Sequence, residues 1–161
     1  MNNEPSATGA MRVDRLSVFA FLWACQALVH QEFYSKWIDD RDPLGWLVAL
    51  FAVATLLRPR ALAPLGLLPL TSTAYNVGKW PFVLNHILVE TLVNVAILSA
   101  MISCSLSRLD RGSERWRDAV LDRFRPAVMA MLVVMYSFAA LAKLNHDFID
   151  PEFSCAVTLY G

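Results

Sequence analysis

The sequence predicts an all-α membrane protein, a polytopic bundle of about five spanning helices. Hydrophobic residues make up 57% of the 161 residues and the mean hydropathy is +0.44, whereas a soluble domain is roughly 45–50% apolar. Charged residues make up only 17% and lie in short stretches between long uncharged runs. Because a backbone in lipid must satisfy its own hydrogen bonds and the period-2 alternation of barrel strands is absent, the runs are expected to be helices.

Five uncharged runs mark the expected spans. A helix that crosses the hydrocarbon core needs about 20 mainly apolar residues. The second run is short and the third contains Pro64 and Pro69. These two runs form either two separate spans or one kinked, re-entrant hairpin, and in the second case the protein has four spans in total. The runs cover residues 16–31, 44–57, 61–78, 91–107 with a backward extension over 80–89, and 126–142.

Residues 1–11 are expected to be a polar tail, and residues 12–161 one transmembrane helical domain. The tail has no basic region ahead of the first run, which Arg12 and Arg15 flank, so we expect an uncleaved signal anchor. A cleavable signal peptide, with small residues over 24–27, is the alternative. The domain is either complete or the N-terminal part of a longer protein.

Several classes of function find no support in the sequence. The 14 Lys and Arg residues balance the 14 Asp and Glu residues, so there is no basic field to hold a nucleic acid. Motifs for nucleotide binding, zinc hydrolysis and serine hydrolysis are absent, and no metal site is expected. The three cysteines lack zinc-ligand spacing and are interpreted as buried apolar side chains: Cys25, Cys104 and Cys155.

The basic residues predict a cytoplasmic N-terminus. With five alternating spans, ten of the 14 basic residues fall on the side of the N-terminus, in agreement with the positive-inside rule. Six of these ten lie in residues 108–125, which we interpret as an amphipathic cytoplasmic connector, a solvated loop rather than a contact with lipid headgroups. The four remaining residues lie on the outer side: Lys36, Arg41, Lys79 and Lys143.

Polar residues inside two of the runs form stripes near the outer side. His86, Glu90 and Asn94 are spaced i, i+4, i+8 and share one helix face, as Gln26 and His30 do in the first run. A charged carboxylate in the hydrocarbon core costs at least a few kcal/mol, so Glu90 is expected to face the bundle interior, to be protonated or to pair with a cation. Gln26 and Asn94 are interpreted as hydrogen-bonding links between helices, whereas Glu90 and His86 are either such links or functional.

Residues 136–148 read Y-S-F-A-A-L-A-K-L-N-H-D-F and resemble the Y-x-x-A-G-x-x-K-L-x-x-x-W segment of vitamin K-dependent gamma-carboxylases and the wider HTTM (horizontally transferred transmembrane) domain family. Asn85-His86 is similar to the Asn-His pair of the carboxylases. Ala140 replaces the usual Gly and Phe148 the usual Trp. The matching positions of the segment are Tyr136, Ala139, Lys143 and Leu144.

The resemblance implies a site on the outer side that binds and deprotonates a reduced, vitamin K-like quinone. Lys143 would be the base and His86 its helper, while Asn85 and Tyr136 would contact the cofactor. We further expect Glu90, one turn deeper, to orient the imidazole of His86. The alternatives are that the Lys143 ammonium extends to the interface and that Tyr136 is an interfacial aromatic.

Two classes of function therefore stay open. One is carboxylase-like lyase chemistry with Lys143 as base; the carboxylases, however, continue into a soluble β-rich domain, for which we expect no counterpart within these 161 residues. The other is a non-enzymatic membrane bundle that binds lipid or partners a larger membrane or soluble subunit. A transporter with Glu90 in a cation path is disfavoured because no inverted repeat is visible.

The predicted orientation is directly testable. A cysteine introduced next to Lys143 should react with a membrane-impermeant thiol reagent added from the outside of intact cells. Labelling only from the cytoplasmic side would contradict the topology.

Overall fold

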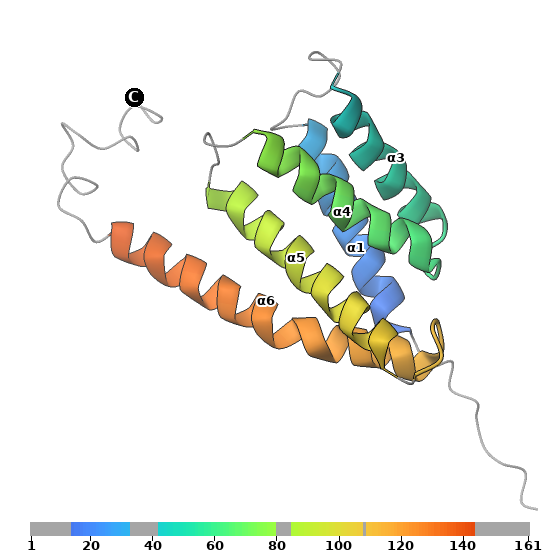
Figure 1. Ribbon diagram of the computed structural model, residues 1–161. Coiled ribbons are helices and arrows are strands. Elements are labelled where there is room, and N and C mark those ends of the chain that lie inside the picture. Colours follow the sequence, from blue (N-terminus) through green and yellow to red (C-terminus); the bar gives the residue numbers. More distant parts are fainter. Residues whose placement is uncertain (1–13, 33–41, 80–84, 108, 144–161) are drawn as a thin grey trace, which may run out of the picture.

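A computed structural model describes residues 14–32, 42–79, 85–107 and 109–143. Over these residues the protein contains five helices and no strand, which confirms the all-α prediction (Figure 1). Four of the helices match predicted runs closely. The helices are α1 (Arg15–His30), α3 (Pro43–Leu57), α4 (Leu62–Gly78), α5 (Asn85–Leu106) and α6 (Glu114–Lys143).

Local signals explain where the helices begin. The Asp14 carboxylate accepts a hydrogen bond from the backbone N–H of Ser17, 3.3 Å away, and caps α1. Asp42 caps α3 in the same way, and Pro43 occupies the first turn, where its missing N–H costs nothing. Between α5 and α6 the chain turns through Gly112, whose φ of +84° suits glycine.

Helices that follow one another in the chain pack side by side, and α1 also contacts α4 and α6. One face of α1 consists of Ala20, Ala24 and Ala27, all buried, and small side chains of this kind let neighbouring helices approach closely. The larger core cluster joins α1, α4, α5 and the first turns of α6 around Leu16, Ile97 and Trp116.

Helix α6 differs most from the prediction. It begins at Glu114 and runs through Pro126, so residues 114–125 are helical and do not form a solvated loop. Trp116, Val120 and Phe124 recur every fourth residue and are buried in the core, which is why this charged segment folds onto the bundle. Beyond Pro126, α6 diverges from α5 (Figure 1) and exposes large apolar side chains such as Val133 and Phe138.

Length and composition make two helical segments candidates for membrane spans. They are Ile87–Leu106 and Glu114–Leu141, while α1 and α3 are shorter apolar helices. Only a small share of the second segment is buried within the protein. These features are compatible with a membrane protein, and the number of five spans stays a prediction.

The described loops that the sequence assigns to the cytoplasmic side lie together at one end of the bundle, here called the basic end. The start of α1, the turn between α3 and α4, and the start of α6 meet there (Figure 1). His30 and the start of α5 lie at the opposite end.

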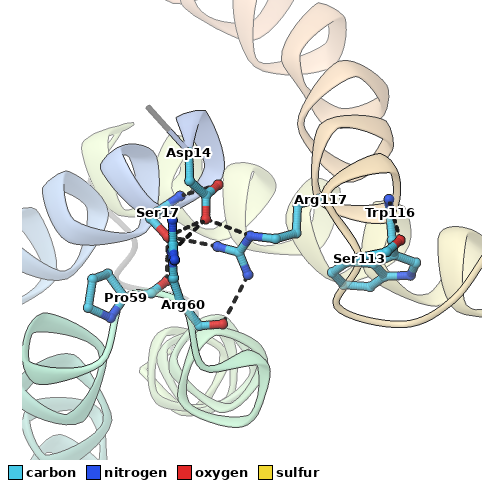
Figure 2. Close-up of polar contacts among 7 residues, drawn as sticks. All are labelled: Asp14, Ser17, Pro59, Arg60, Ser113, Trp116 and Arg117. Carbon is cyan, nitrogen blue, oxygen red and sulfur yellow. Dashed lines mark hydrogen bonds and ion pairs between the residues drawn. The ribbon is translucent and has the colours of Figure 1, made fainter. Parts of the chain in front are cut away.

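Four residues, Asp14, Ser17, Arg60 and Arg117, form an arginine clasp at the basic end (Figure 2). The Arg117 side chain is only 7% exposed. Its Nε donates to Asp14 Oδ2 at 2.8 Å, its Nη2 to Ser17 Oγ at 2.9 Å and its Nη1 to the carbonyl oxygen of Arg60 at 3.0 Å. The Arg60 guanidinium is 3.6 Å from the same carboxylate. One side chain of α6 therefore binds both α1 and the turn between α3 and α4.

The clasp lowers the pKa of Asp14 below its ordinary value. Burial of the carboxyl group, the largest single influence, raises the pKa, but the hydrogen bonds from Ser17 and the charge and hydrogen bond of Arg117 together outweigh it. The folded state therefore favours the charged carboxylate.

Arg117→Ala should lower the free energy of unfolding by about 1–3 kcal/mol, because it removes three part-buried hydrogen bonds between α6 and the rest of the bundle. Unfolding in detergent micelles, followed by circular dichroism, measures the change. The control is Arg115→Ala, an exposed arginine of the same helix, for which a change within about 0.5 kcal/mol is expected. Equal losses in the two variants would contradict the role of the clasp.

The contribution of Asp14 should also depend on pH. Because the folded pKa is lowered, this contribution is fully present above the unfolded pKa of about 4 and is lost as the pH falls through the folded pKa. The stability difference between wild type and Asp14→Asn should therefore be constant near neutral pH and shrink below about pH 4. If the stability difference between wild type and Asp14→Asn grew as the pH fell, the pKa of Asp14 would be raised in the folded protein and not lowered.

Candidate buried acid–base site

The Glu90 carboxylate lies buried between three helices, and its side chain is 5% exposed. Oε1 accepts a hydrogen bond of 2.6 Å from the Ser72 hydroxyl of α4. Oε2 accepts one of 3.3 Å from the amide of Gln26 on α1 and pairs with Nδ1 of His30, also on α1. The only carboxylate within an uncharged run is thus held by polar groups from two neighbouring helices.

Asn94 extends these contacts one turn further along α5. Its Oδ1 accepts from the indole N–H of Trp23 at 3.0 Å, and its Nδ2 donates to Ser72 Oγ at 2.9 Å. Ser72 therefore joins Asn94 to Glu90. We call these six residues the interhelical polar cluster: Trp23, Gln26, His30, Ser72, Glu90 and Asn94.

Helical spacing explains how the cluster forms. On α1, Trp23, Gln26 and His30 are spaced three and four residues apart, and on α5 Glu90 and Asn94 are four apart, so each set shares a face. On α4, Ser72 and Asn76 are also four apart, and the Asn76 amide donates to the Thr91 hydroxyl at 3.1 Å. The three polar faces meet through hydrogen bonds that join α1 and α4 to α5.

The His30–Glu90 pair gives the cluster its acid–base chemistry. Both side chains are almost fully buried, at 4% and 5% exposure. A carboxylate and an imidazole that together hold one proton are neutral overall, so the pair avoids the cost of an isolated buried charge. The same pair can bind or release a proton in a region from which bulk water is excluded.

The structure brings only some of the predicted site residues together. The interpretation of Gln26 and Asn94 as links between helices is confirmed by their hydrogen bonds to Glu90, Trp23 and Ser72. Asn85 and His86 form the first turn of α5, one turn before Glu90, and their side chains lie outside the described residues. The expected contact between His86 and Glu90 therefore stays a prediction.

The remaining predicted residues lie on α6. Tyr136 is 67% exposed, and Lys143 is the last residue of the helix, with a side chain outside the described residues. In Figure 1 this end of α6 lies apart from the start of α5. The described helices thus place Glu90 in contact with His30, whereas the end of α6 lies away from this pair.

The sequence did not single out Trp23 or Ser72, and it did not pair His30 with Glu90. Serine and tryptophan are common in membrane helices as isolated residues, so neither carries a signal alone. The spacing of Ser72 and Asn76 on one face of the third run was the available sign. The pairing of His30 with Glu90 had no local sign, because the two residues lie 60 positions apart.

Two further polar side chains lie at the end of the bundle that contains His30, and both are buried without a hydrogen-bond partner among the described residues. They are Gln31, whose Oε1 is unpaired, and Tyr75, whose hydroxyl is unpaired; the two residues are 1% and 2% exposed. The Lys79 ammonium lies 4.4 Å from the centre of the Tyr75 ring. Unsatisfied buried groups of this kind are rare in folded proteins and suit a polar ligand or bound water.

The described residues contain no group of three metal-binding side chains. Cys25 and Cys104 are free thiols; Cys104 is buried, as predicted, and Cys25 is half-buried. The third cysteine, Cys155, lies outside the described residues. No protein-family model, curated protein or solved structure matches the chain.

The coupling between His30 and Glu90 can be measured with a double-mutant cycle. His30→Ala and Glu90→Ala should each destabilise the protein, and their combined effect should differ from the sum by at least about 1 kcal/mol, because the two side chains are in contact. The measurement is unfolding in detergent micelles.

The control cycle combines His30→Ala with Thr55→Ala. Thr55 is also buried, but its hydroxyl donates to the carbonyl oxygen of Phe51 within α3. These two effects should add within about 0.5 kcal/mol. If the stability effects of His30→Ala and Glu90→Ala were also additive, the proposed coupling between the two side chains would be wrong.

Proposed function

We propose that this protein is a multi-pass membrane protein that binds a weakly acidic, apolar molecule of the quinol type and accepts its proton. The observation that carries the proposal is the buried His30–Glu90 pair. Ionisable residues inside membrane helices are costly and usually serve function, and an acid–base pair is the means of moving a proton in an apolar region.

Gln31 and Tyr75, whose polar side-chain atoms have no partner among the described residues, support a ligand of this kind. The Gln31 carbonyl could accept a hydrogen bond from a phenolic hydroxyl, and the Tyr75 hydroxyl could donate one or accept one. A reduced quinone would supply such hydroxyls on an apolar ring. The proton leaving its O–H bond would pass to the His30–Glu90 pair, which then holds one proton more.

The roles that the carboxylase resemblance implies are the alternative assignment of the base, in place of the His30–Glu90 pair. Lys143 would be the base, His86 its helper, and Asn85 and Tyr136 the contacts to the quinol. These roles require the end of α6 to approach the start of α5, which is why the Lys143 variant is tested separately from the His30–Glu90 pair.

Binding of a water-soluble hydroquinone to the full chain in liposomes tests the proposal. Quenching of tryptophan fluorescence reports binding, because Trp23 belongs to the polar cluster. We expect Glu90→Gln to weaken binding about tenfold, the effect of losing one charge-assisted hydrogen bond. Glu32→Gln, an exposed carboxylate two residues after His30, should bind like wild type.

Two outcomes would overturn parts of the proposal. Wild-type binding by Glu90→Gln would eliminate the His30–Glu90 pair as proton acceptor. If Lys143→Ala binds the hydroquinone like wild type while Glu90→Gln binds it more weakly, the proposed role of Lys143 is eliminated and the His30–Glu90 pair remains.

The second candidate is a non-enzymatic membrane bundle that binds lipid or a partner subunit. It is favoured by the continuous hydrogen bonds from Trp23 through Asn94 and Ser72 to Glu90, which link three helices. Under this function, Glu90→Gln would lower thermal stability in detergent, and no hydroquinone would bind to the wild type.

A further inference from the structure

An open groove lies at the basic end, between the start of α1 and the turn that joins α3 to α4. Val18, Pro59 and Ala61 contribute apolar surface to it, and the exposed arginines Arg58 and Arg60 stand beside them. The same groove includes Asp14 and Ser17 of the arginine clasp. Apolar surface and guanidinium groups are therefore adjacent at one end of the apolar helices.

The groove carries an excess of positive charge. Among the described residues that line it, the one carboxylate is Asp14, which is bound by the buried guanidinium of Arg117 at 2.8 Å. The charge of Asp14 is thereby neutralised, although Arg60 also lies 3.6 Å from it. The charges of Arg58 and Arg60 remain in excess, and a guanidinium binds phosphate through paired hydrogen bonds.

We propose that this groove binds an anionic phospholipid. The phosphate of the headgroup contacts Arg58 and Arg60, and the first carbons of an acyl chain lie against Val18. Helix α4 begins at this point with no side-chain cap, so its first backbone N–H groups add to the attraction for an anion.

A phospholipid fits the groove better than a soluble anion for two reasons. The groove contains apolar surface next to its charged side chains. An acyl chain would cover this apolar surface, whereas a free phosphate would not. It also lies where two apolar helices meet arginines, since α1 begins at Arg15 and Arg58 follows the end of α3, as expected of a membrane–water boundary. The inference rests on the membrane location in the proposed function but is independent of the His30–Glu90 site.

Binding of fluorescent phosphatidylglycerol to the full chain in neutral detergent micelles tests the inference. The double variant Arg58→Gln and Arg60→Gln should weaken binding about tenfold. The control, Arg111→Gln and Arg125→Gln, removes the same charge from exposed positions outside the groove and should change binding less than about twofold. Equal losses in both double variants would mean that diffuse charge attracts the lipid, and would overturn the site.

A second variant keeps every charge. Val18→Trp should fill the apolar part of the groove, because Val18 is exposed there, and should also weaken phosphatidylglycerol binding several-fold. Circular dichroism checks that each variant is folded. Unchanged binding by Val18→Trp would overturn the proposed position of the acyl chain and with it the site.

Two competitors identify the ligand chemistry. Phosphatidylcholine should compete weakly and millimolar glycerol phosphate should not compete; effective competition by either would overturn an anionic phospholipid as the ligand. Extraction of cell membranes with alkaline carbonate separates this inference from the proposed function. Release of the protein would contradict both, whereas retention without a preference for phosphatidylglycerol would contradict this inference alone.

Discussion

The burial of the Glu90 carboxylate between three helices is the constraint on which the rest of the bundle depends. A carboxylate in an apolar interior is tolerated only when other groups compensate for its lost hydration. Ser72, Gln26 and His30 do so here, and they belong to α1 and α4. Because each must lie level with Glu90, the contacts determine how far α1 and α4 are shifted along α5. Asn94 repeats the constraint one turn deeper.

The two ends of the bundle combine charge and burial differently. At the basic end, Arg117 and Asp14 form a clasp beside exposed arginines, so charge there lies close to water. At the opposite end, the His30–Glu90 pair is enclosed by helices, and both side chains are almost fully buried. The clasp also determines the position of α6, whose first turns are buried in the core while its later turns expose apolar side chains. A lipid environment would cover those side chains without requiring another protein segment.

The sequence predicted the helical class and four helices closely, because uncharged runs bounded by Asp, Pro and Arg leave little choice of structure. It failed over residues 114–125, where alternating Asp and Arg suggested a solvated connector. The charges there cover the outer face of a helix whose inner face carries Trp116, Val120 and Phe124. The many charged residues in this segment made the apolar stripe difficult to recognise from the sequence. The role of Arg117 could not be recognised either, since nothing local distinguishes the buried arginine from its exposed neighbours.

By itself, the sequence determined that Glu90 must face the bundle interior, be protonated or pair with a cation, because a lone carboxylate within an apolar run is costly in any fold that buries it. It also determined that Gln26 and Asn94 would hydrogen-bond across helices. Only the tertiary structure decided that His30 of α1 is a partner of Glu90. The spacing of i and i+4 within α5 pointed to His86, since periodicity describes neighbours along one helix. Which histidine reaches the carboxylate from another helix depends on how α1 packs against α4 and α5, and that follows from side-chain volumes on all three helices together.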